Sequence, residues 1–590
     1  MNEILKFLEE KIEKAYEIAK KYGVIIGWVS RTSPSNISEE GGLVIFDVEP
    51  AIYFRDFINI ASAGSYLAVV DIKTNHIISL RIVSVERRDV LAELDLPDVY
   101  VGTPSKEASG LLTRTRVKAK PLLAYDPENG EVSIANYVVE PQSPVIKLEN
   151  REVIQKILGL PEDGVFLGFY LPLKTFYQHV IVLGTTGSGK TTLLKNMISS
   201  FGVNEELNKT TILVMDPNRD YVTLPLRPTW DFSTLNRELE LKMINNINDR
   251  INRPRGLTII LPITRYVLEN IKEDNLNWAR ALKSIAEDYI YSTYYSIAER
   301  QSWNIEIEDT KISEEPGNPP LRYVELNIKV KYGVEKESYE LYIIPYGFRF
   351  TDVSPREFIS LNPYFTRQAK DSLSRLLNYL RTRNAYIETI YDLYDALREA
   401  RYRLHEKPGS PRGVVLDPNK EYIVELIKDL AIHKSTLENI LRQIGSLIDT
   451  GLFDIRVPIG VGEDKYLHEP RIEDIMENHH RIFKGYPIIV DLEYLQEHSF
   501  ADPEKVISIT AFRILNKVFE WKLTRTRQRR TTQPVIILID EAHRFFPSKG
   551  GGREEYIEHV SSMIDRIARL GRARRLGLVF STHSPKDVHE

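Results

Sequence analysis

The segment 179-HVIVLGTTGSGKTTLLKNMI-198 constrains the fold more than any other part of this sequence. It contains the pattern G-x-x-x-x-G-K-[ST] between an apolar run and a helix-forming run. Glycines allow a tight turn whose backbone N–H groups face phosphate oxygens, a lysine neutralises those oxygens, and a threonine hydroxyl ligates Mg²⁺. A plain glycine-rich turn is the alternative. The flanking pattern favours a P-loop that binds ATP, made of Gly184, Thr185, Thr186, Gly187, Ser188, Gly189, Lys190, Thr191 and Thr192.

Four further apolar runs follow the P-loop along the chain. They are continuous rather than alternating, as is typical of strands that are buried on both faces of a parallel sheet. Helix-forming stretches lie between them, so the pattern predicts an α/β fold with a mainly parallel sheet. The five predicted strands are 179–184, 211–216, 487–492, 534–540 and 576–582.

The run 535-VIILIDEAHRFF-546 ends a predicted strand in an acidic pair. Asp540 is placed to hold the metal through water, and Glu541 to polarise the attacking water. A strand that ends in two acids by chance is the alternative. The letters DEAH also name a class of helicases, in which this motif follows the P-loop closely and precedes a second motor domain. Here 350 residues separate Lys190 from Asp540 and only 49 follow Glu541, which excludes that class.

A basic helix end and a polar strand end follow the acidic pair. The run 560–569 predicts a helix, and Arg569 or Arg572 near its end is a candidate for an arginine donated across a subunit boundary to the γ-phosphate. Cations that complement the helix dipole are the alternative. The strand 576–582 delivers Ser581, Thr582 and His583 to its carboxyl end, beside the P-loop. His583 is a candidate sensor of the γ-phosphate, with a structural cap as the alternative.

The rest of the chain divides into blocks of different pattern. Apolar side chains recur at helical spacing up to Gly23. Short β-rich runs follow and predict a small barrel or sandwich, namely 24–30, 43–48, 66–72, 77–86, 114–120 and 134–140. The predicted divisions are an N-terminal helix (1–23), a β-barrel (24–148), the first part of the ATPase core (149–230), a mostly helical insertion with a hairpin of 322–332 and 338–345 (231–480), and the second part of the core (481–590).

Composition excludes several classes of protein. The formal charge is −5, from 78 Lys and Arg against 83 Asp and Glu, so a nucleic-acid contact requires a local basic surface. There is no cysteine, which excludes disulfides and thiolate metal sites and fits a reducing interior. No apolar run reaches the roughly 18 residues of a membrane span. Charged residues interrupt the N-terminal segment throughout, so it is not a signal peptide. We therefore expect a soluble, cytoplasmic protein without a membrane partner.

Together these motifs resemble the HerA family of archaeal and bacterial hexameric ATPases, in the same group as the FtsK DNA pumps. The segment 215-MDPNRDY-221 resembles the family's D-x-x-G-E-Y segment, with Asp220 in the acidic place, and 485-GYPIIVDLEYL-495 resembles its third strand. The segment 538-LIDEAHRFFP-547 matches its second acidic motif, and 567-IARLGRARRLGLVFSTHSP-585 resembles its last motif. The β-rich block resembles the family's HAS-barrel. The resemblance covers roughly 24–230 and 480–590, and the middle segment corresponds only loosely to a helical insertion of the family.

The resemblance implies a RecA-like P-loop ATPase core in a homohexamer that threads double-stranded DNA through its pore by hydrolysing ATP with Mg²⁺. It also implies a NurA-like nuclease and the Mre11–Rad50 complex as partners in DNA end processing and repair. Three features depart from the family. His583 stands where the family has Gln, Arg219 replaces a Gly, and the chain ends at Glu590 where family members continue. The last feature indicates a truncated chain or a short branch, and a missing strand could impair ring assembly or hydrolysis.

Local charge is compatible with DNA. Residues 522–590 carry 14 Lys and Arg against 8 Asp and Glu. The run 522-KLTRTRQRR-530 is their most basic part and is either a DNA contact or a solvated loop between elements. The glycines 550–552 are a candidate pore loop.

Other functions share parts of this pattern. An ABC- or SMC-like ATPase is suggested by 581-STHSP-585, but 505-KVISITAFRILNKVFEWK-522 lacks the LSGG-type signature which that class requires. A conjugation-type ATPase that pumps protein or DNA has the same motor core, and fold analogy does not separate the cargoes. A regulatory ring that binds ATP without moving DNA is a further alternative, which ATPase activity unchanged by duplex DNA would favour.

Overall fold

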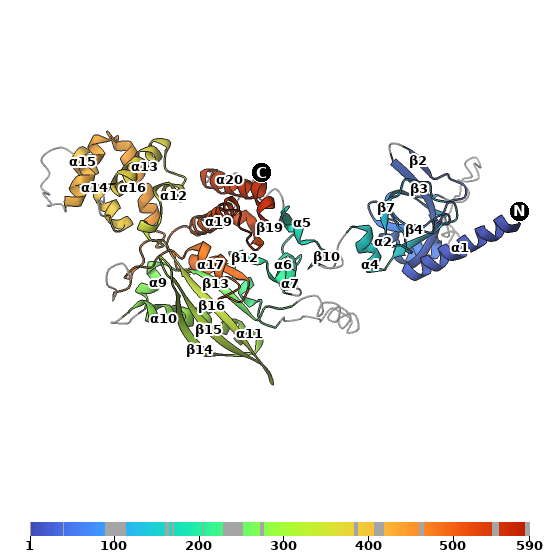
Figure 1. The fold of residues 1–590 in the computed structure, drawn as a ribbon, viewed down its shortest axis with the longest axis horizontal. Coiled ribbons are helices and arrows are strands. Elements are labelled where there is room, and N and C mark those ends of the chain that lie inside the picture. The colour runs from blue at the N-terminus through green and yellow to red at the C-terminus, as the bar shows by residue number, and fades with distance from the viewer. Residues whose placement is uncertain are drawn as a thin grey trace, which may run out of the picture. The chain divides into compact units, whose positions relative to one another are not determined.

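The computed structural model describes residues 2–38, 41–88, 114–159, 164–167, 170–202, 205–227, 252–271, 276–382, 387–405, 418–458, 465–545 and 554–583. The chain forms two compact units, residues 1–172 and residues 173–590 (Figure 1). Each unit has its own sheet and its own hydrophobic core. The predicted α/β fold is confirmed, with an antiparallel β unit first and a P-loop core second.

A closed antiparallel barrel forms the centre of the first unit. Strands β3, β1, β8, β4, β5 and β6 follow one another, and β6 pairs back with β3, which closes the ring and confirms the predicted barrel. Phe46, Val69 and Leu80 are fully buried inside it. The strands are β1 (Gly23–Val29), β2 (Asn36–Ser38), β3 (Gly41–Val48), β4 (Tyr66–Val70), β5 (Ile77–Arg88), β6 (Arg114–Tyr125), β7 (Val132–Ile134), β8 (Pro144–Leu148), β9 (Val165–Phe166) and β10 (Tyr170–Leu171).

Two details of the first unit differ from the sequence prediction. The run 134–140 is not a strand, because the N–H of Glu140 donates to the buried Asp71 carboxylate (2.9 Å) instead of to a neighbouring strand. The first unit also extends beyond residue 148, since Val153 and Ile157 of one helix join an apolar cluster on the barrel strands. The helices of this unit are α1 (Asn2–Tyr22), as predicted, α2 (Pro50–Ile60) and α4 (Arg151–Ile157).

A nine-stranded sheet organises the second unit, in the order β11-β19-β18-β12-β17-β13-β16-β15-β14. The strands from β11 to β16 are parallel, and β15 and β14 continue the sheet antiparallel. Strands β12, β17 and β18 are buried at every residue, which explains their continuous apolar sequences. The five predicted strands are confirmed as β11 (Val180–Leu183), β12 (Thr211–Asp216), β17 (Ile488–Asp491), β18 (Val535–Ile539) and β19 (Leu576–Thr582).

The described part of residues 231–480 is mostly helical and contains the hairpin, as predicted, but it is not separate from the core, which corrects the sequence prediction. Strand β13 (Gly256–Pro262) pairs in parallel with both β17 and β16, and therefore lies inside the core sheet. The predicted hairpin is confirmed as β15 (Leu321–Tyr332) and β16 (Glu335–Tyr346), and β14 (Asn304–Glu315) pairs with β15. This stretch of chain completes the sheet as well as contributing helices.

Helices α12 to α16 form a lobe that shares its hydrophobic core with the sheet (Figure 1). The helix-forming stretch 368–400 contains two helices. The side chains of Thr389 and Asp392 each accept the other residue's backbone N–H (both 3.1 Å), which starts the second helix there. None of the described helices combines the length and apolarity that crossing a membrane requires. The helices and helical turns of this unit are α5 (Leu173–Phe176), α6 (Lys190–Ser200), α7 (Glu205–Asn208), η2 (Tyr221–Thr223), α9 (Arg265–Glu269), α10 (Trp278–Ile290), η3 (Tyr291–Tyr295), α11 (Ser296–Gln301), η4 (Phe350–Asp352), α12 (Pro355–Ser360), α13 (Arg367–Thr382), α14 (Ile390–His405), α15 (Pro418–Asp429), α16 (Lys434–Ile448), α17 (Ile472–Asn478), α18 (Leu492–Glu497), α19 (Pro503–Arg527), η6 (Ala542–Arg544), α20 (Glu554–Gly571) and η7 (Arg572–Arg574).

Candidate active site

The P-loop connects β11 to α6 at one edge of the sheet. Gly187 and Gly189 have positive φ angles of 78° and 89°, which glycine adopts without strain. A Cβ at Gly184 would lie 2.3 Å from the Ser188 Oγ, so the tight turn also requires a residue without a side chain there. Residues 185–189 are exposed, and α6 begins at Lys190. The loop therefore presents backbone N–H groups and a helix N-terminus to solvent, as a phosphate site requires.

Lys190 lies folded against its own loop. Its side chain is buried, and its Nζ donates to the Thr185 carbonyl (3.4 Å) and to the His583 Nδ1 (3.3 Å). His583 follows β19, which pairs with β11 so that Leu183 is opposite Thr582. The structure thus brings the predicted lysine and the candidate sensor together from positions 393 residues apart.

Asp540 is the centre of a buried hydrogen-bond network. Its Oδ2 accepts from the Thr191 hydroxyl (3.1 Å) and the Tyr221 hydroxyl (2.7 Å). Its Oδ1 accepts from the Glu541 N–H (3.0 Å) and the Ser581 hydroxyl. Asp540 is 2% exposed, so these donors replace the water that a buried carboxylate loses. The P-loop threonine and the strand-end aspartate therefore share one site.

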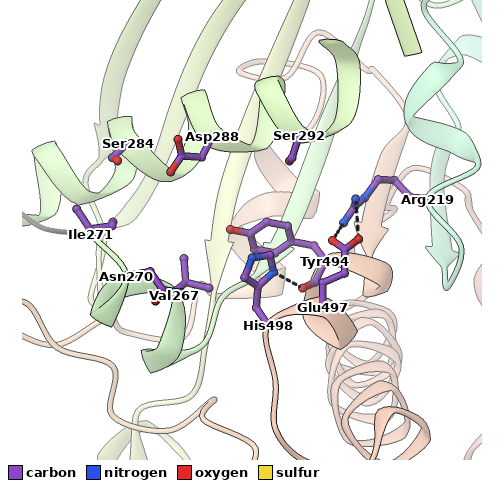
Figure 2. A pocket seen from close by; sticks show the side chains of 10 residues that line it. All are labelled: Arg219, Val267, Asn270, Ile271, Ser284, Asp288, Ser292, Tyr494, Glu497 and His498. Atoms are coloured by element: carbon purple, nitrogen blue, oxygen red, sulfur yellow. Dashed lines mark hydrogen bonds and ion pairs between the residues drawn. The ribbon is translucent and has the colours of Figure 1, made fainter. Parts of the chain in front are cut away.

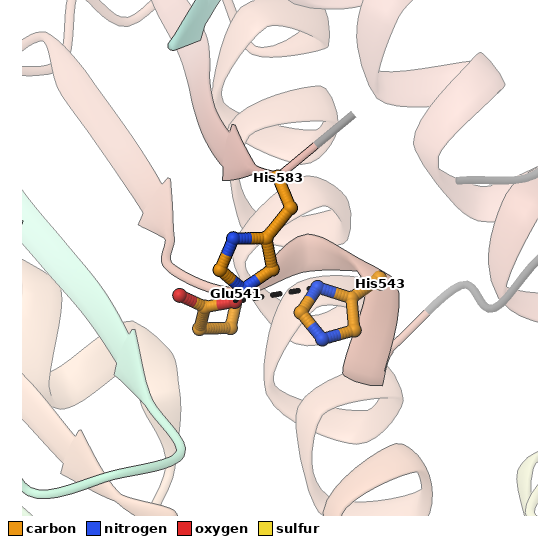
Figure 3. A group of neighbouring side chains, drawn as sticks. All are labelled: Glu541, His543 and His583. Atoms are coloured by element: carbon orange, nitrogen blue, oxygen red, sulfur yellow. Dashed lines mark ion pairs between the residues drawn. The ribbon is translucent and has the colours of Figure 1, made fainter. Parts of the chain in front are cut away.

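Glu541 turns away from Asp540 and meets two histidines. The φ angle of Glu541 is 49°, in the left-handed region, so its side chain points in a different direction from the side chain of Asp540. One carboxylate oxygen, Oε2, lies 3.3 Å from the His543 Nδ1 and 3.1 Å from the His583 Nε2 (Figure 3). The candidate general base is thus 16% exposed and lies between two imidazoles at the rim of the site.

The loop after β12 closes the site from another side. Asp216 is buried and accepts the backbone N–H groups of Asn218, Asp220 and Tyr221, which shapes this loop. Burial raises the pKa of Asp216 to about 7, although the loop N–H groups act in the opposite direction. Burial also lowers the pKa of Lys195, whose Nζ donates to the Thr223 hydroxyl at 3.2 Å. Asp220, predicted for the acidic place of this segment, lies in this loop near Lys195.

Arg219 joins the same loop to the end of β17. Its Nε donates to the buried Asp491 (2.9 Å), and its Nη2 donates to Glu497 (2.5 Å). Its φ angle of 56° is left-handed, which costs a non-glycine residue about 1–2 kcal/mol. The ion pair with a fully buried carboxylate offsets that cost and accounts for arginine at a position where the family has glycine. Arg219 also lines a pocket of about 470 Å³ beside Tyr494 and His498 (Figure 2).

The donor set fits ATP with Mg²⁺. Thr191 and Asp540 offer a hydroxyl and a carboxylate oxygen 3.1 Å apart, which are the hard ligands that Mg²⁺ prefers. Phosphates would lie against the P-loop N–H groups and Lys190, next to this pair. Glu541 is placed at the same edge, at the carboxyl end of β18.

The predicted arginines do not reach this site within the chain. Arg569 is 77% exposed and pairs with Asp565 (2.8 Å), and Arg572 is exposed in η7. Both precede the amino end of β19, whereas the P-loop lies at its carboxyl end. A strand of seven residues spans about 20 Å, so neither arginine serves the nucleotide of its own subunit.

The basic run 522–530 is a solvated loop only in its last three residues, because α19 extends to Arg527 and residues 528–530 form an exposed turn after it. Lys522 is fully buried and donates to the Thr532 hydroxyl (2.9 Å), and Arg525 pairs with Glu477. These two side chains therefore already have partners within the chain, while Arg527, Arg529 and Arg530 are exposed. The candidate pore loop, residues 550–552, lies outside the described residues.

The fold and the site agree with the comparison to known families. Residues 163–444 match the family model described as Helicase HerA, central domain. These residues, just under half of the chain, are similar to the HerA central domain. The HerA match includes the P-loop and most of the helical lobe, while β17, β18 and β19 follow it and pair in the same sheet.

One solved structure and one negative finding complete the comparisons. The structure of VirB4 of Thermoanaerobacter pseudethanolicus is similar over 72% of this chain and 80% of its own, with 13% identity and a TM-score of 0.29. No curated protein matches the chain.

Sequence reasoning missed several residues of this candidate active site. Tyr221 was part of the recognised D-x-x-G-E-Y segment, and the tyrosine that ends this segment was the available signal. His543 had no predicted role, although it contacts Glu541. Ser581 was expected near phosphate but bonds Asp540 instead. Lys195 carried no sequence signal, and Asp491 lay in the recognised third-strand segment without an assigned role, because only folding brings these two residues to the loop after β12.

Proposed function

We propose that this HerA-type P-loop ATPase hydrolyses ATP to translocate double-stranded DNA as a homohexameric ring. The observation that carries the proposal is the contact of the Thr191 hydroxyl with the Asp540 carboxylate at 3.1 Å, across 349 residues of sequence. ATP hydrolysis requires the Thr191 hydroxyl and the Asp540 carboxylate at the same nucleotide, so two distant positions would have argued against this activity.

Each residue has a role in this proposal. The P-loop N–H groups of residues 184–192 and the Lys190 ammonium bind the β- and γ-phosphates. Thr191 directly and Asp540 through water hold Mg²⁺, which when bound neutralises phosphate charge. Glu541 orients the attacking water and accepts its proton. His583 senses the γ-phosphate, because it already contacts both Lys190 and Glu541.

The position of the two arginines supports the proposed ring. Arg569 and Arg572 lie at the opposite end of β19 from the P-loop of their own chain, so they are available to the site of a neighbouring subunit. Donation of an arginine in trans is a recurrent solution in ATPases that respond to assembly. We further propose a NurA-like nuclease and the Mre11–Rad50 complex as partners in DNA end processing.

Mass photometry and ATPase assays on one preparation test the proposal, with and without duplex DNA. We expect a species near six subunits, and hydrolysis that duplex DNA stimulates. Lys190→Ala should abolish hydrolysis at every DNA concentration, while replacement of the exposed Lys209 by Ala serves as a matched control and should not. Monomers with turnover retained in Lys190→Ala would refute the motor. Hydrolysis by rings that ignore duplex DNA would favour a protein cargo or a regulatory ring.

A further inference from the structure

Three side chains beside the acidic pair have the composition of a transition-metal site. Glu541 and His543 come from the turn after β18, and His583 comes from the end of β19 (Figure 3). One possible ligand atom of each lies within 4.8 Å of the others. The side chains are 16%, 31% and 34% exposed, so an ion from solvent can reach them. Their elements are buried strands and a short turn, which hold the ligands in place.

The distances within this cluster match the edges of a coordination polyhedron. Ligands about 2.0–2.1 Å from a tetrahedral zinc ion lie about 3.3 Å from each other. The Glu541 Oε2 is 3.3 Å from the His543 Nδ1 and 3.1 Å from the His583 Nε2. Two of the three edges therefore have the required length, and the third requires a small rotation of the imidazoles, whose ring centroids are 5.3 Å apart.

We propose that Glu541, His543 and His583 bind a divalent transition cation of the zinc class. Two imidazole nitrogens and one carboxylate oxygen suit zinc, cobalt or iron, and they disfavour Mg²⁺, which takes oxygen ligands. Thr191 and Asp540 offer only oxygens. The active site thus holds two neighbouring ligand sets of different chemistry, one hard and one borderline.

Lys190 and the metal compete for His583. The lysine ammonium only donates, so the His583 Nδ1 that it contacts must carry a lone pair and the Nε2 the proton. A metal on Nε2 reverses this arrangement, because the proton then lies on Nδ1 and faces the ammonium. Removing the Lys190 side chain should therefore strengthen metal binding rather than weaken it.

Metal binding would also stop hydrolysis, and this consequence alone rests on the proposed function. A bound cation engages the Glu541 carboxylate and withdraws it from the attacking water. Zinc should inhibit the wild-type ATPase at concentrations that fill the site. The His543→Gln variant should be inhibited less at the same concentrations.

The test is zinc binding by the full chain without nucleotide, measured by competition with a chromophoric chelator, with cobalt as a spectroscopic probe. We expect one zinc per chain, with affinity lost about tenfold or more in His543→Gln and in His583→Gln. His468→Gln is the matched control, because His468 also lies 3.0 Å from a carboxylate, that of Asp352, but is outside the three-residue cluster. The zinc affinity of the His468→Gln variant should equal that of the wild type.

The outcomes separate this proposal from the motor proposal. Lys190→Ala should bind zinc at least as tightly as the wild type while hydrolysing no ATP. Zinc binding that persists in the His543→Gln/His583→Gln double variant, or a wild type that binds no more tightly than this double variant, would overturn the proposed site. Far-UV circular dichroism checks folding without metal, and Glu541→Gln provides a second variant should a histidine variant misfold.

Discussion

At the scale of single residues, Asp540 shows how the active site is held together. A carboxylate with almost no exposure is stable only when donors replace its water, and here three side chains and one N–H group do so. Asp540 and Thr191 were predictable from their motifs, because each follows a recognisable strand or loop. The contact of Tyr221 was not, since nothing in a single sequence states which buried hydroxyl meets which acid.

Tyr221→Phe tests this network. The variant removes a 2.7 Å bond to a buried carboxylate, so we expect a loss of roughly 1.5–3 kcal/mol of stability. We also expect a higher Mg²⁺ requirement for hydrolysis, because Asp540 loses one of the bonds that orient it. ATPase rates as a function of Mg²⁺ concentration, with thermal unfolding, measure both effects.

The matched control is Tyr294→Phe, which removes a buried bond of 2.8 Å to the neutral Val222 carbonyl. This variant should lower the free energy of unfolding by only about 0.5–1.5 kcal/mol and leave the Mg²⁺ dependence of ATP hydrolysis unchanged. Equal Mg²⁺ curves for both variants would contradict a special role of Tyr221.

At the scale of elements, most of the buried strands were predictable, but strand β13 and the burial of the basic end of α19 were not. Five continuous apolar runs became parallel strands, and one alternating pair became the hairpin of β15 and β16. Strand β13 was overlooked, although 256-GLTIILP-262 is as apolar as the others, because it lies far from any motif. The sequence prediction also treated the basic end of α19 as wholly exposed, for a different reason. Burial of Lys522 depends on tertiary packing that charge patterning does not reveal.

Lys522 makes the stability of this helix end depend on pH. Burial lowers its pKa from 10.5 to about 7, with the charge of Arg575 acting in the same direction. Between these values the unfolded chain holds a proton that the folded chain lacks, so this residue makes stability rise with pH. The dependence vanishes below the folded pKa and above the unfolded one.

Lys522→Met removes this dependence. We expect the wild type to gain roughly 1.4 kcal/mol per pH unit relative to the variant between pH 7 and about 10. Unfolding temperatures of both proteins across this range measure the difference. Arg525→Met removes a cation from the same helix end that stays charged throughout, and should show no such trend. A constant difference between wild type and Lys522→Met would refute the buried, neutral lysine.

At the scale of the whole molecule, the P-loop ATPase core was predictable from the sequence motifs, whereas the positions of the arginine candidates in that core required the structure. The P-loop and the arginine candidates lie at opposite ends of β19, so the proposed contact of an arginine with the γ-phosphate requires a second chain.

Mixing two inactive variants tests donation in trans. Lys190→Ala lacks its own nucleotide site, and Arg572→Ala lacks the arginine offered to a neighbour. We expect each variant alone to be inactive. In a 1:1 mixture that assembles at random, up to about one interface in four combines an intact nucleotide site with an intact arginine, so the mixture should regain activity at those interfaces. The same mixture with Arg569→Ala identifies which arginine acts. Mixtures as inactive as their components, for both arginines, would exclude a finger from this helix end.

The most direct test of the central claim, that Lys190, Thr191, Asp540 and Glu541 form a single ATP site, is ATP binding and turnover measured side by side in Glu541→Gln. The amide keeps the size of the side chain but cannot accept the proton of the attacking water. We expect ATP affinity near that of the wild type, with hydrolysis slower by about 10²–10⁴-fold, whereas Lys190→Ala should lose binding as well. Hydrolysis by Glu541→Gln at the wild-type rate would contradict the account.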